Sequence, residues 1–175
     1  MMRTAIVGNA GGGKSTLARQ MAANLCVPHI EVDRLLWREG WVETSPEVYE
    51  RQHADVIVAD GWVIDGLGRL DSIPHRLSRA THIVLIDMPL WMHYWLAAER
   101  QIAWAVGLLE HSPGGLTKMP STEALFQAMW NVEQSWMPEI RALCAEAEQQ
   151  GKAVVRLASV EEIDAFSLSQ AVAAK

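Results

Sequence analysis

Residues 8–16 read GNAGGGKST and follow directly on the apolar run AIV at residues 5–7. They fit the pattern GxxxxGK[ST], in which glycines let the backbone curl so that successive N–H groups point at phosphate oxygens. Apolar residues at spacing four, Leu17, Met21 and Leu25, predict a following helix whose N-terminus adds positive charge. This mechanism requires a strand before the glycines and a helix after them. The stretch therefore predicts a binding site for a nucleoside triphosphate.

The members of this loop have separate expected roles. Lys14 is expected to reach the β- and γ-phosphates, and Ser15 to coordinate Mg²⁺. Thr16 is expected to touch the α-phosphate. The cradle itself would be formed by the backbone of Gly8, Asn9, Ala10, Gly11, Gly12 and Gly13. The predicted cofactors are therefore ATP and Mg²⁺.

The rest of the chain alternates short apolar or β-branched runs with longer segments of helical period. The strand candidates are residues 4–7, 29–32, 62–65, 82–87 and 153–157. Such alternation predicts a parallel sheet with helices on both faces. We therefore expect one domain over residues 1–175, an α/β P-loop NTPase with three layers (α/β/α) and a five-stranded parallel sheet.

The balance of charge argues against nucleic acid as a partner. The chain has a formal net charge of −6 and a pI near 5.5, and it contains no run of Lys or Arg. Duplex binding needs clustered cations that displace counterions. Charged residues interrupt the most apolar region, residues 83–109, so we expect no membrane span. Cys26 and Cys144 stand in no metal-binding pattern and are expected to be buried thiols of a cytoplasmic protein.

Aspartates follow three of the expected strands, where parallel sheets carry functional groups. They are Asp33, Asp65 and Asp87. Asp65 lies about fifty residues beyond the phosphate loop, where a second carboxylate can orient the water shell of Mg²⁺. Asp87 is expected to cap the helix that begins near Pro89.

The chain contains eight tryptophans. Trp62 lies in an expected strand, and Trp91 and Trp95 are one helical turn apart, so core packing is expected for these three. Trp37 and Trp41 follow Asp33 and are candidates for the wall of a substrate pocket, because aromatic rings stack on planar ligands at low entropic cost.

The only linker-like stretch is GLLEHSPGGLTKMPS at residues 107–121. Its three glycines and two prolines predict a loop inserted between two helices. We expect residues of about 106–122 to form a lid.

Two stretches resemble known families. Asp65-Gly66 followed by Arg69 resembles the DG-x-x-R signature of nucleoside monophosphate kinases, with Leu-Gly in place of the usual aromatic-proline pair. DRLLWREGWVE at residues 33–43 resembles the small adenylate-kinase-like family known as topology modulation proteins. This likeness runs from residue 2 to about residue 100 and resumes at VVRLASVEEIDAF, residues 154–166. It implies a P-loop kinase core with strands in the order 2-3-1-4-5 and a lid insertion.

The resemblance also implies roles for single residues. Asp33 would contact an acceptor hydroxyl, Arg69 would face the acceptor or its phosphate, and Arg100 would be the first lid arginine. The adenine would lie against Ala158 and Ser159. The implied acceptor region is about residues 33–60, with the site residues Asp33, Arg34, Trp37, Arg38, Trp41, Asp65, Gly66 and Arg69. The implied catalytic set is Lys14, Asp33, Arg69 and Arg100.

The leading hypothesis is a kinase that transfers the γ-phosphoryl group of ATP to a nucleoside monophosphate or another small acceptor. For an alcohol, Asp33 could accept the proton; for a nucleotide, Arg69 with Arg34 or Arg38 would pair the phosphate. One departure favours an alternative, a non-catalytic or weakly hydrolytic ATP-binding regulator: between Arg100 and residue 141 the only cation is a lysine. A GTPase is rejected because the chain lacks the guanine-recognition motif N/T-K-x-D. The oligomeric state stays open.

Overall fold

The structure is a computed structural model that describes residues 2–112 and 116–173. Residues 113–115, which fall within the predicted lid, lie outside the described residues. Within the described part of the chain, no helix combines the length and the apolar character needed to cross a membrane.

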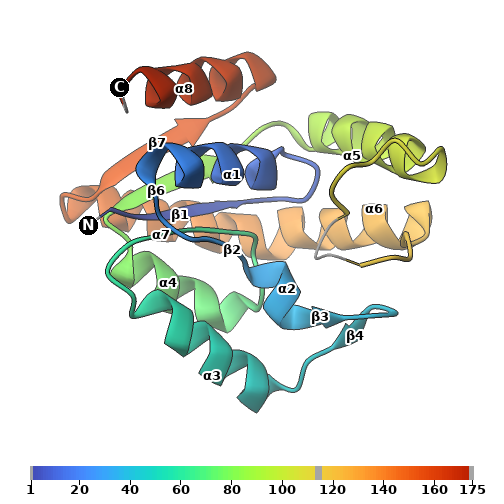
Figure 1. Cartoon of the computed structure of the whole chain (residues 1–175), viewed down its shortest axis with the longest axis horizontal. Coiled ribbons are helices and arrows are strands. Elements are labelled where there is room, and N and C mark those ends of the chain that lie inside the picture. The colour runs from blue at the N-terminus through green and yellow to red at the C-terminus, as the bar shows by residue number, and fades with distance from the viewer. Residues whose placement is uncertain (1, 113–115, 174–175) are drawn as a thin grey trace.

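A five-stranded parallel sheet forms the centre of the molecule (Figure 1). Its strands, in spatial order, are β2 (His29–Glu31), β5 (Trp62–Asp65), β1 (Arg3–Gly8), β6 (His82–Ile86) and β7 (Ala153–Leu157). Each strand ends within one residue of the position predicted from the sequence. The parallel α/β fold is confirmed.

A small antiparallel hairpin, β3 (Trp37–Arg38) with β4 (Val42–Glu43), lies outside this sheet and was not predicted. Because β3 and β4 belong to this hairpin, the five parallel strands are numbered β2-β5-β1-β6-β7 in their spatial order. Counted among themselves along the chain, the five parallel strands follow the order 2-3-1-4-5.

Helices cover both faces of the sheet, because alternate residues of each strand point to opposite faces. One face is covered by α1 (Lys14–Leu25) and α8 (Val160–Ala173). The other is covered by α3 (Pro46–Ile57), α4 (Ile73–Arg79) and α7 (Met137–Gln149). Along β1, Ile6 packs toward α1, whereas Ala5 and Val7 pack toward α4 and α7.

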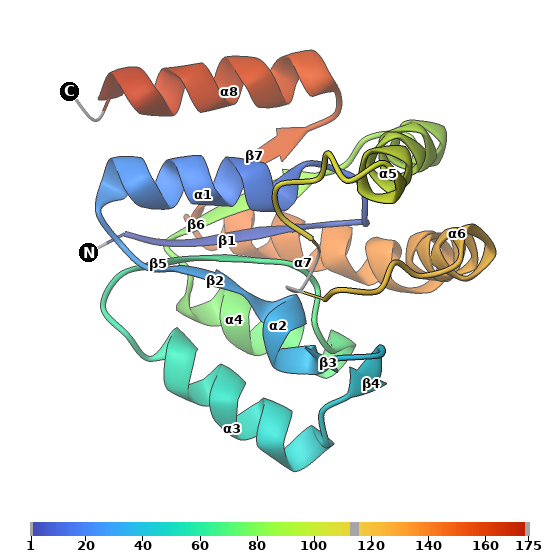
Figure 2. The same ribbon diagram turned by 45° about the vertical axis from the view of Figure 1, so that its right-hand side comes forward.

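Two further helices extend beyond the carboxyl edge of the sheet (Figure 2). They are α5 (Leu90–Ala105) and α6 (Thr122–Asn131), which lie side by side. A π-helical segment, Val132–Trp136, joins α6 to α7. Below them in this view lie α2 (Val32–Leu36) and the hairpin.

The position of α5 corrects the prediction for the tryptophans. Trp62 is fully buried, as predicted. Trp91 and Trp95 are instead 64% and 63% exposed, because they lie on the side of α5 that turns away from the sheet. The prediction that both cysteines are buried also holds only in part: Cys144 is buried, but Cys26 is exposed at the end of α1.

The expectation that Asp87 caps a helix is wrong. The residue at the N-cap of α5 is Pro89. The Asp87 carboxylate is buried and pairs with Arg141 at 2.8 Å and with Arg156 at 2.6 Å. It therefore ties the end of β6 to α7 and β7.

Candidate active site

A cleft of about 1880 Å³ opens at the carboxyl edge of the sheet. It is bounded by the phosphate loop, α2 and the hairpin, the segment after β5, α5 with the loop beyond it, α6, and the first turns of α8. This is the edge at which parallel α/β sheets bind ligands.

The phosphate loop has a backbone that requires glycine. Gly11 and Gly13 have φ values of 78° and 72°, in the left-handed region. A Cβ atom on Gly8 would lie 2.3 Å from the carbonyl oxygen of Ile86, and one on Gly11 would lie 2.4 Å from that of His93. The loop is therefore pressed against β6 and α5, and its shape fits a phosphate cradle at the start of a helix.

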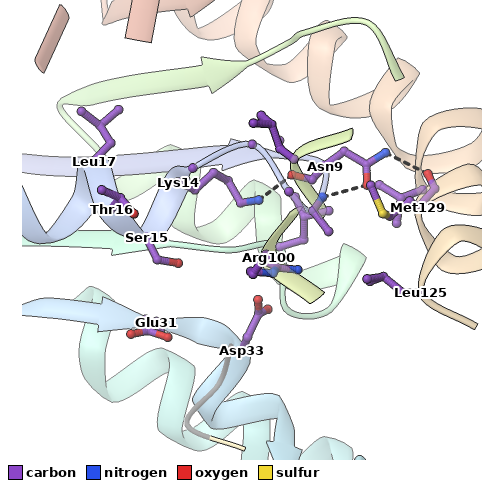
Figure 3. Close-up of a pocket in the computed structure, with 18 of the residues that line it drawn as sticks. Asn9, Lys14, Ser15, Thr16, Leu17, Glu31, Asp33, Arg100, Leu125 and Met129 are labelled. Atoms are coloured by element: carbon purple, nitrogen blue, oxygen red, sulfur yellow. Dashed lines mark hydrogen bonds between the residues drawn. The ribbon is translucent and has the colours of Figure 1, made fainter. Parts of the chain in front are cut away.

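Lys14 points into this cradle, where its Nζ donates a hydrogen bond of 2.6 Å to the carbonyl oxygen of Asn9 (Figure 3). Burial lowers the pKa of Lys14, and the nearby carboxylates of Asp33 and Asp65 oppose this effect. An ammonium group at this position is well placed to meet phosphate oxygens.

The side chain of Asn9 anchors the loop to a distant helix. Its Nδ2 donates to the carbonyl oxygen of Met129 on α6 at 2.8 Å, and its Oδ1 accepts from the N–H of Ala10 at 2.8 Å. The sequence predicted only a backbone role for Asn9, because nothing near it in sequence indicates a contact 120 residues away.

His93, on α5, supports the same loop from the other side. A hydrogen bond of 2.9 Å joins its Nδ1 to the carbonyl oxygen of Ala10. Burial lowers the pKa of His93 to about 4, so the imidazole is neutral at physiological pH and donates from Nδ1. Nothing near His93 in the sequence indicates this contact with the phosphate loop, 83 residues away.

The predicted metal ligands meet across two elements. Ser15 Oγ donates to Asp65 Oδ2 at 2.6 Å, and His29 Nε2 lies 2.7 Å from Asp65 Oδ1. A hydroxyl beside a carboxylate is a donor set that suits Mg²⁺, which keeps several waters and phosphate oxygens of its own. Among residues 2–112 and 116–173, no three His, Cys, Asp or Glu side chains cluster in a way that could hold a metal.

Asp33 and Arg100 face each other across the cleft (Figure 3). Burial raises the pKa of Asp33, and the charge of Asp65 adds to this; Lys14, Arg76 and a hydrogen bond from the Gly68 backbone N–H act in the opposite direction. Burial lowers the pKa of Arg100, opposed by Asp33. The charge of Asp33 thus acts on two cations that line the same cleft, Lys14 and Arg100.

The predicted aromatic wall is present. Trp37 and Trp41 both line the cleft, and their rings meet edge to face with centroids 5.7 Å apart. The indole Nε1 of Trp41 also donates to the carbonyl oxygen of Lys118 at 2.9 Å. These contacts join the hairpin to the described part of the predicted lid.

A second pair of groups makes the same connection. The Glu39 carboxylate accepts hydrogen bonds from the hydroxyl and the backbone N–H of Thr117. The side-chain bond from Thr117 is the main reason that the pKa of Glu39 is lowered. We call the two contacts, from Trp41 and from Glu39, the hairpin–lid contact.

Several predicted site residues lie outside the cleft. Arg34 pairs with Glu31 at 3.4 Å, and Arg38 donates to the carbonyl oxygen of Glu43 at 3.2 Å; both are exposed. Gly66 and Asp65 are buried beneath the cleft surface, whereas Arg69 lines it. Ala158 and Ser159 follow β7 next to the lining residue Val160. The structure therefore does not bring Arg34 or Arg38 to the other acceptor residues.

No protein-family model and no curated protein sequence matches the chain. Solved structures that are similar in fold include two shikimate kinases and a gluconokinase. A gluconokinase from Sinorhizobium meliloti 1021 has 12% identity and a TM-score of 0.53, covering 98% of this chain and 92% of its own. A shikimate kinase from Bacteroides thetaiotaomicron has 16% identity and a TM-score of 0.52, covering 96% and 95%. A shikimate kinase from Acinetobacter baumannii in complex with shikimate has 13% identity and a TM-score of 0.55, covering 97% and 90%.

These likenesses extend over nearly the whole chain, and they establish the fold of the P-loop small-molecule kinases. The resemblance to the topology modulation proteins receives no support from a family model and stays a prediction.

Proposed function

We propose that this protein is an ATP-dependent kinase that phosphorylates a small molecule bearing a hydroxyl group. The observation that carries the proposal is the convergence of Lys14, Asp33 and Arg100 on one cleft beside the phosphate loop. The kinase fold of the similar structures supports the same reaction class.

The nucleotide would be held by the chain's own backbone and three side chains. The N–H groups of residues 8–16 would bind the β- and γ-phosphates, with Lys14 between them. Ser15 and Asp65 would hold Mg²⁺, which neutralises charge on the phosphates when bound. The adenine would lie against Ala158 and Ser159, near Val160 at the mouth of the cleft.

The acceptor would lie between α2, the hairpin and α5. Its hydroxyl oxygen would attack the γ-phosphorus as the bond from that phosphorus to the β–γ bridging oxygen breaks, so that ADP leaves. The hydroxyl proton would pass to Asp33, and its raised pKa makes this carboxylate a stronger base. Lys14 and Arg100 would neutralise the charge that develops on the transferred group.

Two observations favour a hydroxyl-bearing acceptor over a nucleoside monophosphate. A nucleotide acceptor needs cations for its own phosphate, but Arg34 and Arg38 lie outside the cleft. Arg69 lines the cleft, and its Nε lies 3.5 Å from the carboxylate of Asp71. Phosphoryl transfer to a nucleoside monophosphate is therefore the second choice.

A regulatory protein is the alternative that one observation favours. The hairpin–lid contact joins two segments about 77 residues apart, so nucleotide binding could be transmitted through the lid to a partner. Such a protein would bind ATP without rapid turnover.

The test combines binding with turnover. Titration calorimetry would measure ATP-Mg²⁺ binding to the wild type, to Lys14→Ala and to the control Lys118→Ala, whose side chain is exposed. A coupled assay would then measure ADP release with polyols, hydroxy acids and nucleoside monophosphates. Binding lost only in Lys14→Ala, with ADP release stimulated by a hydroxylated acceptor, is the expected result. Binding without stimulated turnover would favour the regulator, and absence of nucleotide binding would overturn both.

A further inference from the structure

Arg76 is a fully buried arginine on α4, directly beneath the acceptor side of the cleft. Its Nη2 donates to the carbonyl oxygens of Gly66 at 2.8 Å and Leu67 at 3.3 Å. Its Nε and Nη1 have no hydrogen-bond partner within residues 2–112 and 116–173. Burial of a guanidinium is costly unless nearby groups compensate its charge. Packing alone does not account for this residue.

The compensating charges belong to the candidate active site. Burial lowers the pKa of Arg76, and Tyr49, Asp33 and Asp65 oppose that effect. The positive charge of Arg76 also affects Asp33, because Arg76 is among the groups that lower the pKa of this carboxyl.

Arg76 acts on Asp33 from α4, an element that contributes none of the other charged groups described around this carboxylate. The charged groups that face Asp33 are Lys14 from α1, Asp65 from β5, Arg76 from α4 and Arg100 from α5. Lys14 and Arg100 line the cleft and would be engaged by phosphate, whereas Arg76 lies below its surface.

The second target of Arg76 is the segment Gly66–Gly68. Both glycines have positive φ, 97° and 63°, and a Cβ on Gly68 would lie 2.1 Å from the hydroxyl of Tyr49. A Cβ on Gly66 would lie 3.1 Å from Asp33 Oδ1, and the Gly68 N–H is among the groups that lower the pKa of Asp33. Glycine offers no side chain through which this backbone could be fixed, so Arg76 holds it through its carbonyl oxygens.

We propose that Arg76 is a positioning residue for phosphoryl transfer: it fixes the Gly66–Gly68 backbone and supplies a permanent positive charge that keeps Asp33 in its proton-accepting form. The proposal rests on the proposed kinase function for its catalytic meaning. Its two parts, charge and geometry, can be separated by substitution because lysine keeps the charge but cannot reproduce the planar fork of arginine.

The test is an NMR titration of the Asp33 carboxyl carbon in the full-length protein, with the signal assigned through Asp33→Asn. In Arg76→Met, the Asp33 midpoint should rise by about one pH unit or more, because an opposite charge has been removed. The control Arg79→Met removes an exposed arginine of the same helix that contacts the Ile57 and Val58 carbonyl oxygens, and it should leave the midpoint unchanged.

Arg76→Lys tests the geometric part. It should restore most of the Asp33 midpoint but reduce the acceptor-dependent kcat/KM about tenfold, with faster amide exchange at Gly68. Should Arg76→Met fail to fold, Arg76→Gln replaces it in the titration.

Equal Asp33 midpoints in the wild type and the neutral variant would overturn the charge role. Full kcat/KM with unchanged Gly68 exchange in Arg76→Lys would overturn the geometric role. Because the titration and the exchange need no acceptor, a failure of this inference is distinguishable from a failure of the kinase proposal.

Discussion

The two sides of the cleft are built in different ways. The nucleotide side is one continuous stretch, residues 8–16, whose shape depends on glycine backbone angles. The acceptor side combines α2 and the hairpin, the segment after β5, Arg100 on α5, and the lid segment around Lys118. A local sequence can specify the first side, whereas the second exists only when distant elements pack together.

The largest effect is expected at Lys14. Lys14→Ala removes the cation that faces the phosphates, so the rate constant for turnover should fall by about 10² to 10³. ATP affinity, measured by calorimetry, should fall with it. Lys118→Ala, on the lid, should stay within about twofold of the wild type, since its side chain is exposed and only its backbone carbonyl is used. Equal losses of turnover and ATP affinity in Lys14→Ala and Lys118→Ala would contradict the proposed role of Lys14 on the nucleotide side.

Asp33→Asn should separate activity from stability. Turnover of a hydroxylated acceptor should fall by about 10², because the proton acceptor is lost. The folded-state pKa of Asp33 is raised, so its contribution to stability is present below the unfolded-state pKa and is lost as pH rises through the folded-state value. The variant should therefore be more stable than the wild type at pH 8, and this gain should shrink at pH 4.

Urea unfolding at both pH values measures this difference. A stability gain that is the same at pH 4 and pH 8 would contradict the assignment.

Gly11→Ala tests how tightly the nucleotide side depends on its neighbours. The new methyl group would meet the carbonyl oxygen of His93 at 2.4 Å in addition to the cost of a positive φ. The free energy of unfolding should fall by about 2 to 4 kcal/mol. Gly107→Ala, at φ 75° with no atom within 4 Å of the new Cβ, carries the backbone cost alone, about 1 kcal/mol. Similar losses in both would show that contact with α5 adds nothing.

The smallest effect is expected at the hairpin–lid contact. Trp41→Phe keeps an aromatic ring but removes the indole N–H that bonds to Lys118. The KM for the acceptor should rise by about three- to tenfold, with ATP affinity unchanged, because a single hydrogen bond is worth about 1 kcal/mol. Trp130→Phe, which is 50% exposed on α6, provides the comparison. An equal change in KM in the two variants would remove the special role of this contact.

The sequence by itself determined the parts that depend on local patterns. The glycine spacing predicted the phosphate loop, and the alternation of apolar runs predicted all five parallel strands within one residue. Both signals lie within windows of fewer than about 18 residues, because backbone angles and side-chain periodicity are local properties. The meeting of Ser15 with Asp65 also followed, since Asp65 ends β5 and Ser15 begins the helix that follows the neighbouring strand β1.

Only the tertiary structure decided which distant groups became partners. Asp87 had the sequence context of a helix cap, but its carboxylate pairs with arginines of α7 and β7. Trp91 and Trp95 had the spacing of core residues, yet the direction in which α5 leaves the sheet exposes them. Nothing in the sequence around Arg76 indicated that its side chain would bond to the backbone of Gly66. Such outcomes depend on how whole helices are oriented on the sheet, and that orientation is fixed by packing between elements far apart in the chain.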